Sequence, residues 1–387
     1  MAGADERFMA AALRLSRRHL GLTDTNPSVA CLIVREDVVV GTAVTAIGGR
    51  PHAETQALAE AGARARGATA YVTLEPCAHH GRTPPCCDAL IAAGIVRVVV
   101  CVTDPDERVF GEGIARMHAA GIEVMTDLLR PEGEKALSAY LSRKRRHRPE
   151  VTLKLAVSAD GMIGRKGVGQ VPITGAIARA QTHRMRAESD AILVGLGTAL
   201  ADDPELTCRL PGLEQRSPLR IVLDRRLDLP LASRLVATAG TVPLIVVAEA
   251  PAPDAESAAS PAVPEVHAGS ALRADPRHDA DGFARRRAAL EREGAAILLT
   301  ERHHLHDLLG RLSARGLSSL MVEGGAAIAR AFLEADLVDR IALFTGPRSI
   351  GEGGIASPCV DGRIDGFAPV GRAVFGPDRY TEYERES

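Results

Sequence analysis

Short apolar runs rich in Val, Ile and Leu alternate with helical patterns along most of the 387-residue chain. In the first third of the chain, these runs predict strands at residues 29–34, 38–44, 70–74 and 96–102. The helical patterns between them lie near residues 6–19, 54–67 and 87–93. Gly67 and Gly94 each follow a helical stretch and precede a strand, where a left-handed helix end favours glycine. Strands that alternate with helices predict a layered α/β fold.

The basic run RKRRHRPE, residues 143–150, is the best boundary between two domains. A new strand pattern, VTLKLAVS, follows its proline directly. We expect a first domain at residues 1–147 and a second at residues 148–387. We interpret the run as a solvated linker rather than as a patch that binds nucleic acid.

The second domain repeats the alternation of strands and helices. Its strands are predicted at residues 191–195, 219–223, 244–247, 296–299, 320–322 and 340–344. Between residues 249 and 281 the sequence is rich in Ala, Pro, Ser and Asp, a composition that buries little apolar surface. We therefore expect a mobile surface insertion inside a second α/β domain.

Composition excludes several classes of protein. A formal net charge of −2, only 3% aromatic residues and no Trp disfavour nucleic acid as a partner. No run of about 18 apolar residues predicts a membrane span, and the first residues lack the apolar core of a signal peptide. Seven scattered Cys favour reduced thiols over a disulfide framework. We expect a cytoplasmic protein with no nucleic-acid or membrane partner, and the sequence leaves a homo-oligomer open.

Four residues predict a catalytic zinc site. His52 and Glu54 stand two residues apart where a helix is expected to begin, Cys77 follows a predicted strand, and Cys86 precedes another helix. One imidazole and two thiolates form a zinc site whose fourth position is open to water. Zinc lowers the pKa of that water towards neutrality, and Glu54 can carry its proton to a leaving amine. H-x-E followed by P-C and a further Cys is the signature of zinc nucleobase deaminases.

Two other interpretations stay open. Cys87 could supply a fourth ligand, which would make the chain a non-enzymatic scaffold stapled by zinc. Alternatively, the chain could deaminate tRNA or free nucleosides and carry an accessory domain, since such enzymes share His52, Glu54 and the metal. That second alternative would explain neither the HHGRTPP loop at residues 79–85 nor the second domain.

The loop EPCAHHGRTPPC, residues 75–86, together with Asn26, Pro27 and Val29, resembles the deaminase domain of the bifunctional riboflavin-biosynthesis deaminase–reductases. The resemblance implies a cytidine-deaminase-like three-layer α/β/α domain. It further implies zinc ligands at His52, Cys77 and Cys86, a catalytic Glu54, and substrate contacts at Asn26, His79, Arg82 and Thr83. In this interpretation Asn26 holds the pyrimidine edge, and the three loop residues bind the sugar phosphate.

Three segments, residues 151–164, 187–209 and 321–333, resemble the reductase domain of the same family, which has a dihydrofolate-reductase-like α/β fold and uses NADPH. Matching positions imply contacts with NADPH at Val157, Thr198, Asp202, Gly325, Ala326 and Ala327. They imply contacts with the substrate at Gln170, Arg186, Leu206, Arg209 and Glu323. The chain departs from the family pattern at Pro172, where many members have Trp.

The resemblance implies two reactions of riboflavin biosynthesis on one small-molecule substrate. The first is zinc-dependent deamination of 2,5-diamino-6-(5-phosphoribosylamino)pyrimidin-4-one. The second is reduction of the ribosyl group to a ribityl chain by NADPH. The expected cofactors are therefore one zinc ion in the deaminase domain and NADPH in the reductase domain.

Overall fold

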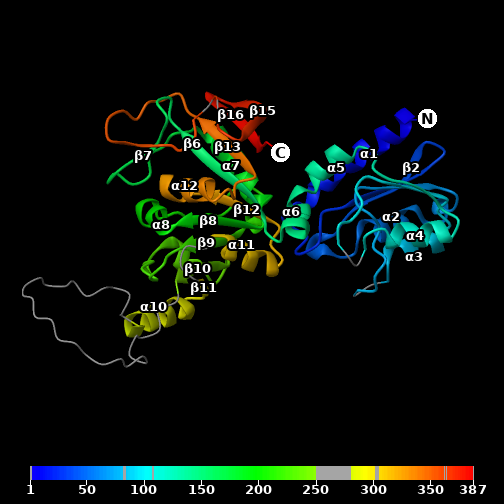
Figure 1. Ribbon diagram of the computed structural model, residues 1–387, viewed down its shortest axis with the longest axis horizontal. Coiled ribbons are helices and arrows are strands. Elements are labelled where there is room, and N and C mark those ends of the chain that lie inside the picture. Colours follow the sequence, from blue (N-terminus) through cyan, green and yellow to red (C-terminus); the bar gives the residue numbers. More distant parts are fainter. Residues whose placement is uncertain are drawn as a thin grey trace, which may run out of the picture.

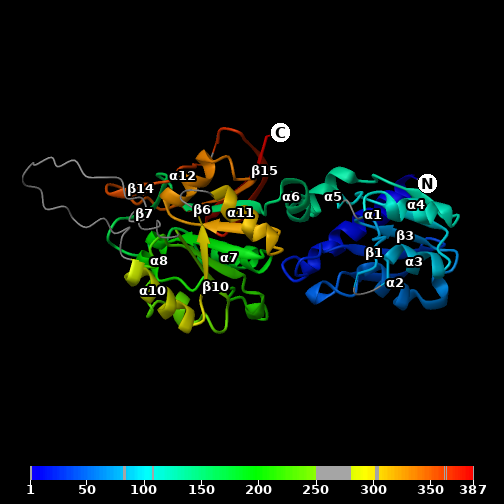
Figure 2. The same cartoon turned by 60° about the horizontal axis from the view of Figure 1, so that its bottom comes forward.

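The computed structural model describes residues 2–81, 84–106, 109–249, 280–300, 305–360, 362 and 364–386. Two α/β domains lie side by side, and helix α6 lies between them (Figure 1, Figure 2). The expected division into two layered sets of strands and helices is confirmed, because the first sheet ends at Met125 and the second begins at Glu150. The insertion expected at residues 249–281 falls almost wholly outside the described residues.

The first domain is built on a five-stranded sheet of order β2-β1-β3-β4-β5. Strand β1 runs antiparallel to β2 and β3, whereas β3, β4 and β5 are parallel. Its elements are α1 (Ala2–Ser16), β1 (Ala30–Arg35), β2 (Val38–Val44), α2 (Ala53–Ala61), β3 (Thr69–Val72), α3 (Cys86–Ala92), β4 (Arg97–Val100), α4 (Glu112–Ala119), β5 (Glu123–Met125), α5 (Arg130–Ala136) and α6 (Ser138–Arg146).

Helices cover both faces of this sheet. Helix α2 packs on β2 and β1 with α3 beside it, while α1 and α5 lie together on the other side (Figure 1). The apolar residues of β1 form one buried core with those of β3 and β4. Gly67 and Gly94, expected at left-handed helix ends, have φ angles of 77° and 73°. This arrangement places the N-termini of α2 and α3 close together.

The second domain has a nine-stranded sheet of order β11-β10-β9-β8-β12-β6-β13-β16-β15. The seven strands from β11 to β13 are parallel, and β16 and β15 add an antiparallel hairpin. The strands of this sheet are β6 (Glu150–Val157), β8 (Ala191–Gly195), β9 (Leu219–Leu223), β10 (Leu244–Glu249), β11 (Ala296–Thr300), β12 (Ser319–Glu323), β13 (Arg340–Thr345), β15 (Phe367–Phe375) and β16 (Asp378–Arg385). A separate antiparallel pair is formed by β7 (Met162–Arg165) and β14 (Gly354–Ala356). The helices are α7 (Ala176–Ala187), α8 (Leu196–Asp202), α9 (Arg234–Ala237), α10 (Ala280–Arg292), α11 (Leu305–Ala314) and α12 (Ala326–Glu334).

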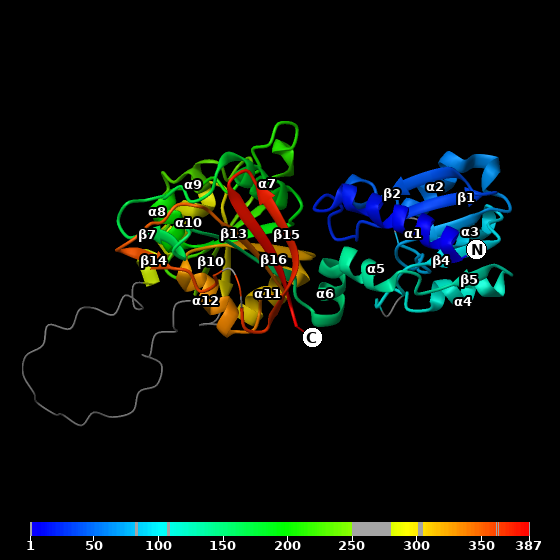
Figure 3. The same ribbon diagram turned by 90° about the horizontal axis from the view of Figure 1, so that it is seen from above.

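Strand β8 shows why the strands of this domain could be predicted from the sequence. All five of its residues are buried, as expected for a parallel strand covered by helices on both faces. The β15–β16 hairpin was not predicted. Strand β15 lies at the edge of the sheet, and its pairing shifts register between Pro369 and Gly371, so its side chains do not alternate cleanly. Figure 3 shows this hairpin on the side of the second domain that faces the first.

The interpretation of residues 143–150 as a solvated linker is wrong. The run is helical as far as Arg146, and its side chains bind both domains. Arg146 and Arg148 form ion pairs with Asp339, at 2.7 and 2.6 Å, and Lys144 pairs with Asp106 at 2.6 Å. Charged side chains spaced along one helical run can reach partners far apart in the sequence, which the composition of the run does not indicate. Among the described residues, none of the helices is long and apolar enough to cross a membrane.

The contact between β2 and α2 depends on the absence of a side chain at Gly41. A Cβ atom added there would lie 2.2 Å from the carbonyl oxygen of Ala57, so the helix backbone would have to move. We expect Gly41→Ala to lower the free energy of unfolding by about 2 kcal/mol, the usual cost of overpacking. Thermal unfolding followed by circular dichroism measures this effect.

Gly310→Ala is the matched control, because Gly310 lies inside α11 and a Cβ there meets nothing within 4 Å. Alanine should raise the stability of that helix by up to about 1 kcal/mol. Opposite shifts of the two unfolding temperatures are therefore expected, and equal shifts would contradict the packing argument.

Candidate active sites

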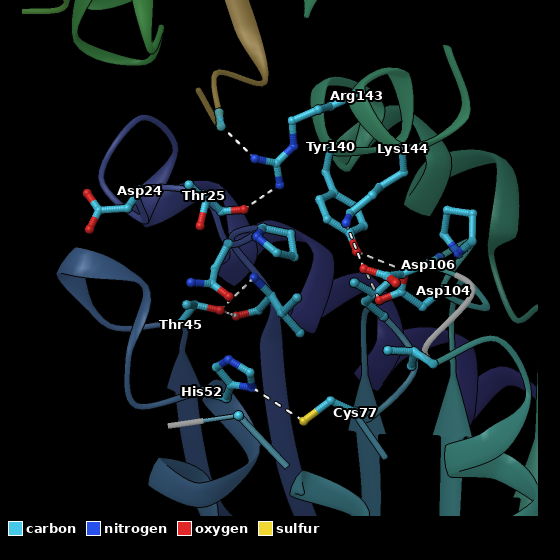
Figure 4. A pocket seen from close by; sticks show the side chains of 18 of the residues that line it. Asp24, Thr25, Thr45, His52, Cys77, Asp104, Asp106, Tyr140, Arg143 and Lys144 are labelled. Atoms are coloured by element: carbon cyan, nitrogen blue, oxygen red, sulfur yellow. Dashed lines mark hydrogen bonds and ion pairs between the residues drawn. The ribbon is translucent and has the colours of Figure 1, made fainter. Parts of the chain in front are cut away.

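Three side chains that could hold a metal converge in the first domain. His52 directly precedes α2, Cys77 follows β3, and Cys86 is the first residue of α3. The His52 Nδ1 atom lies 3.7 Å from the Cys77 sulfur and 3.4 Å from the Cys86 sulfur, and the three ligand atoms lie within 4.8 Å of one another. Figure 4 shows His52 and Cys77 facing each other. The three residues predicted as ligands are thus brought together.

The donor set fits zinc. Tetrahedral zinc with ordinary Zn–S and Zn–N bonds separates a thiolate from an imidazole nitrogen by about 3.6 Å, close to the two distances found. The Cys86 thiol lowers the pKa of Cys77 to about 4, with help from the His52 ring and the Cys86 backbone N–H and against the effect of burial. That N–H lies 3.4 Å from the Cys77 sulfur. One sulfur of the group is therefore held as the thiolate that zinc requires.

Cys87 does not belong to this group. Its thiol donates a hydrogen bond to Asp88 over 3.7 Å, and burial raises its pKa to about 11. Within the described part of the chain, the metal-binding group contains His52, Cys77 and Cys86 alone. Three ligands leave a fourth position open, which is the arrangement of catalytic rather than structural zinc.

Glu54 stands in the first turn of α2 with its carboxyl group buried next to the metal-binding group. Burial and the negative charge of Cys77 raise its pKa to about 7, although His52 opposes the shift. A carboxyl group that titrates near neutrality can both accept and donate a proton. Its position and its pKa match those of a general acid and base.

A cavity of about 1410 Å³ opens in front of these residues. Glu54, His52 and Cys77 line it, as do two of the residues predicted to bind substrate, Asn26 and His79. The Nδ1 atom of His79 is buried and has no hydrogen-bond partner among the described residues. Arg82 and Thr83, also predicted to bind substrate, lie outside the described residues.

A second set of residues lining the cavity was not predicted. The Tyr140 hydroxyl donates to Asp104 over 2.9 Å, and Lys144 pairs with Asp106 (Figure 4). Arg143 lines the cavity beside them. These pairs join the loop after β4 to α6, and they are far apart in the sequence. In the sequence, the polar run TDPD after β4, residues 103–106, could have indicated that this loop belongs to the site.

In the second domain, Glu323 holds a pair of cations. It is the last residue of β12, and its carboxylate accepts hydrogen bonds from Arg186 Nε and Nη2 over 2.8 and 3.0 Å. Lys154 of β6 lies 3.7 Å away. Burial would raise the pKa of Glu323, but the charges of Arg186 and Lys154 outweigh it and hold that pKa at about 2. The structure brings together the predicted Arg186 and Glu323 and adds Lys154.

Lys154 could have been found from the sequence. It is a lysine in the middle of the VTLKLAVS strand pattern, and β6 lies inside a parallel sheet, where ionisable groups are rarely placed without a partner. Burial lowers the pKa of its ammonium group.

The residues predicted to contact NADPH lie mostly at the carboxyl edge of the parallel strands. Val157 ends β6, and Ala326 and Ala327 begin α12. The N–H of Gly325 donates to the Thr198 hydroxyl over 3.0 Å, which ties the start of α12 to α8. Strands β8, β12 and β6 are parallel neighbours, so their ends share the edge where ligands bind in open α/β sheets. Asp202 ends α8 and is half-buried, and burial raises its pKa.

The remaining predicted residues are less closely gathered. Leu206 is buried in the core and has a left-handed backbone with φ of 56°. Arg209 is largely exposed and pairs with Glu205 at 3.0 Å. Gln170 and Pro172 are exposed in an irregular segment between β7 and α7. The Leu206 side chain thus belongs to the core.

Comparisons with known proteins agree with this division of the chain. Residues 3–102 match the family described as the cytidine and deoxycytidylate deaminase zinc-binding region, and residues 149–366 match the RibD C-terminal domain. The chain is 37% identical over 358 residues to riboflavin biosynthesis protein RibD of Escherichia coli, which covers 90% of this chain and 89% of that protein.

Solved structures match the whole chain. RibD of Acinetobacter baumannii superposes with a TM-score of 0.83 at 31% identity, with 100% of both chains covered. A diaminohydroxyphosphoribosylaminopyrimidine deaminase/5-amino-6-(5-phosphoribosylamino)uracil reductase of Thermotoga maritima superposes with a TM-score of 0.80 at 28% identity, covering 100% of this chain and 99% of that one. Both expected folds, deaminase-like and reductase-like, are confirmed. The chain therefore belongs to the RibD family: it is an enzyme of riboflavin biosynthesis with a zinc-binding deaminase domain and an NADPH-dependent reductase domain.

Proposed function

We propose that His52, Cys77 and Cys86 hold the zinc ion and that Glu54 carries the protons of deamination. The substrate in this proposal is 2,5-diamino-6-(5-phosphoribosylamino)pyrimidin-4-one. One observation carries the proposal: the ligand atoms of His52, Cys77 and Cys86 converge beside a cavity that His52, Cys77 and the buried Glu54 line, and the pKa of Glu54 is about 7. We also propose that the deaminase domain spans residues 1–147 and the reductase domain residues 148–387.

Zinc, when bound, supplies an activated water molecule by lowering its pKa towards neutrality. Glu54 accepts the proton of that water and donates it to the departing 2-amino group, which leaves as ammonia. The Asn26 amide can donate and accept at the pyrimidine edge, and His79, which lines the cavity, has a ring nitrogen without a hydrogen-bond partner among the described residues. Arg82 and Thr83 complete the phosphate contacts in this proposal.

In the second domain, NADPH supplies a hydride when it is bound. Backbone N–H groups at the start of α12, at Ala326 and Ala327, suit its phosphates, because no large side chain blocks them, and Gly325 before them lets a phosphate approach the backbone. Val157, Thr198 and Asp202 complete the cofactor site in this proposal.

The substrate site of the second domain is built around Arg186. Three of its five N–H donors bind Glu323 and the carbonyl of Thr207, so two remain for a substrate phosphate. Glu323 thus orients the guanidinium. Gln170, the Leu206 backbone and Arg209 complete the proposed contacts.

The proposal also concerns partners and location. A small phosphoribosyl pyrimidine, rather than nucleic acid, is the expected ligand, since the deaminase cavity mixes acids such as Asp24 and Asp104 with its cations. A cytoplasmic location suits the free thiols, because they must stay reduced to bind zinc. Association into homo-oligomers stays a prediction.

Mass spectrometry of the reaction products tests the proposed function directly. Zinc-loaded protein is mixed with the diaminopyrimidine ribosyl phosphate with and without NADPH. We expect exchange of an amine for oxygen without NADPH and a further gain of two hydrogens with it. Turnover of cytidine instead would support a nucleoside deaminase, and no exchange on any pyrimidine would support a zinc-stapled scaffold.

Glu54→Gln tests the proton carrier. The amide keeps the shape of the side chain but cannot accept a proton, so ammonia release should fall by roughly 10³-fold. Zinc content should stay unchanged, and NADPH oxidation with the deaminated intermediate should match the wild type. Deamination at more than a tenth of the wild-type rate would contradict the role of Glu54.

A pair of cysteine variants tests the open fourth position. We expect Cys77→Ser to lose most of its zinc on dialysis, because a hydroxyl is a far poorer ligand than a thiolate. Cys87→Ser should keep about one zinc per chain, because the Cys87 thiol binds Asp88 and not the metal. Zinc is measured by atomic spectroscopy, and equal loss from both variants would favour a closed, structural site.

Glu323→Gln tests the ion group of the second domain through pH. The pKa of Glu323 is about 2 in the folded protein, below its unfolded value of about 4.3. Its contribution to stability is therefore complete at pH 7, where the variant should be less stable by about 3 kcal/mol. Below the unfolded pKa, unfolding takes up a proton, so the difference should shrink by about 1 kcal/mol by pH 3.5.

Urea unfolding at pH 7 and pH 3.5 measures this difference. Glu188→Gln serves as control, since Glu188 pairs with Arg184 on the surface of α7, where such pairs contribute less than about 1 kcal/mol. A difference between wild type and Glu323→Gln that stays constant with pH would contradict the ion-group argument.

A further inference from the structure

The segment that carries Asn26 is irregular and is held within its own domain by a few hydrogen bonds. The N–H of Asn26 donates to the Thr23 carbonyl over 3.0 Å, and the Thr23 hydroxyl donates to the Asn26 carbonyl over 2.7 Å. The N–H of Gly48 donates to the Leu22 carbonyl over 2.8 Å. Thr25 belongs to the same turn, but none of these three hydrogen bonds involves its backbone. Its position therefore depends on other contacts.

The second domain supplies those contacts. Arg143, in the last turn of α6, donates from Nη2 to the Thr25 carbonyl and from Nη1 to the Gly316 carbonyl, the latter over 2.6 Å. Gly316 follows α11, in the second domain. Figure 4 shows the guanidinium between the Thr25 segment and the chain segment above it. One side chain thus bridges the substrate-binding turn of one domain and a turn of the other.

Gly316 also touches Thr25 directly. Its φ angle is 91°, which glycine adopts readily, and a Cβ added there would lie 2.2 Å from the Thr25 Cγ2 atom. Ser313, Ala314 and Gly316 line the same cavity as Glu54 and Asn26. The second domain therefore forms part of the rim of the deaminase cavity.

The bonding of Arg143 suits a positioning role. Both acceptors are neutral backbone carbonyls, and no carboxylate of the described residues forms an ion pair with its guanidinium. Hydrogen bonds from a charged donor are stronger than those between neutral groups, and the planar guanidinium can hold two acceptors at a fixed separation. The three donors of a lysine share one nitrogen on a flexible stem, so lysine cannot hold two carbonyls at the separation that the guanidinium sets.

We propose that Arg143 is a positioning residue of the deaminase reaction: it holds the Thr25–Asn26 turn against Gly316, so that the second domain completes the substrate site of the first. The inference rests on the proposed function, in which Asn26 binds the pyrimidine. It assigns to one residue of α6 a role in affinity for substrate rather than in proton transfer.

Deaminase kinetics on full-length variants test this role. For Arg143→Ala we expect a KM at least tenfold higher with kcat within about threefold of wild type, because a displaced binding turn weakens substrate binding. Zinc content and NADPH oxidation with the deaminated intermediate should not change. Arg143→Lys should show most of the same defect. Arg130→Ala, which removes an exposed arginine of α5, should leave KM unchanged. An unchanged KM in Arg143→Ala would overturn the proposal.

Gly316→Ala tests the same turn without altering Arg143. Its Cβ should displace Thr25 and raise KM in the same way, and adding Thr25→Ser should restore part of the affinity by removing Cγ2, although alanine at this positive φ keeps some strain in the turn. Recovery in the double variant would support the proposal, even if Arg143→Ala failed to fold. A KM in the double variant that is no lower than in Gly316→Ala would count against it.

A substrate without its phosphate separates positioning from direct binding. If Arg143 positions Asn26, then Arg143→Ala should raise KM by the same factor for the ribosyl phosphate and for its dephosphorylated form. A defect limited to the phosphorylated substrate would overturn positioning and make Arg143 a phosphate ligand. Wild-type protein that deaminates neither compound would instead overturn the proposed function, so the two failures are distinguishable.

Discussion

The N-termini of α2 and α3 meet at one edge of the first sheet, and the deaminase chemistry depends on that meeting. A candidate zinc ligand stands at the start of each helix, His52 just before α2 and Cys86 as the first residue of α3. Free backbone N–H groups at such ends favour negative charge, which helps to hold a thiolate. Gly41 lets α2 lie close on β2, so that Glu54 is buried beside the same point. Burial, together with the charge of Cys77, thus raises the pKa of the carboxyl group that we propose as the proton carrier.

In the second domain, ion pairs rather than a metal ion hold the side chains of the proposed site together. Glu323, at the end of a central parallel strand, is surrounded by the cations Arg186 and Lys154. A buried carboxylate in a parallel sheet is stable only when it is paired, and here the pairing also fixes the orientation of an arginine fork. The same edge of the sheet carries the start of α12, where phosphate binding is favoured. The phosphate of a substrate and the phosphates of a cofactor could therefore both bind at this edge of the sheet.

Much of this architecture was predictable from local sequence. The strands β8 to β10 and β13 appear where continuous apolar runs predict them, and His52, Cys77 and Cys86 converge as their spacing from strands and helices indicates. What could not be predicted involves partners far apart in the chain. The β15–β16 hairpin lacks clean alternation, and the bond of Tyr140 to Asp104 joins residues that no local pattern relates. The roles of individual site residues in binding remain predictions.

The basic run between the domains shows that composition alone does not reveal whether a connecting segment is flexible or held in place. Four arginines and a lysine in eight residues are typical of a solvated linker, yet the described contacts of this run fix the two domains to each other. Arg146 and Arg148 bind Asp339 of the second domain, Lys144 binds Asp106 of the first, and Arg143 bonds to both. A flexible linker would let the domains act independently. A bonded helix at the rim of the deaminase cavity instead makes the shape of one active site depend on the domain that carries the other.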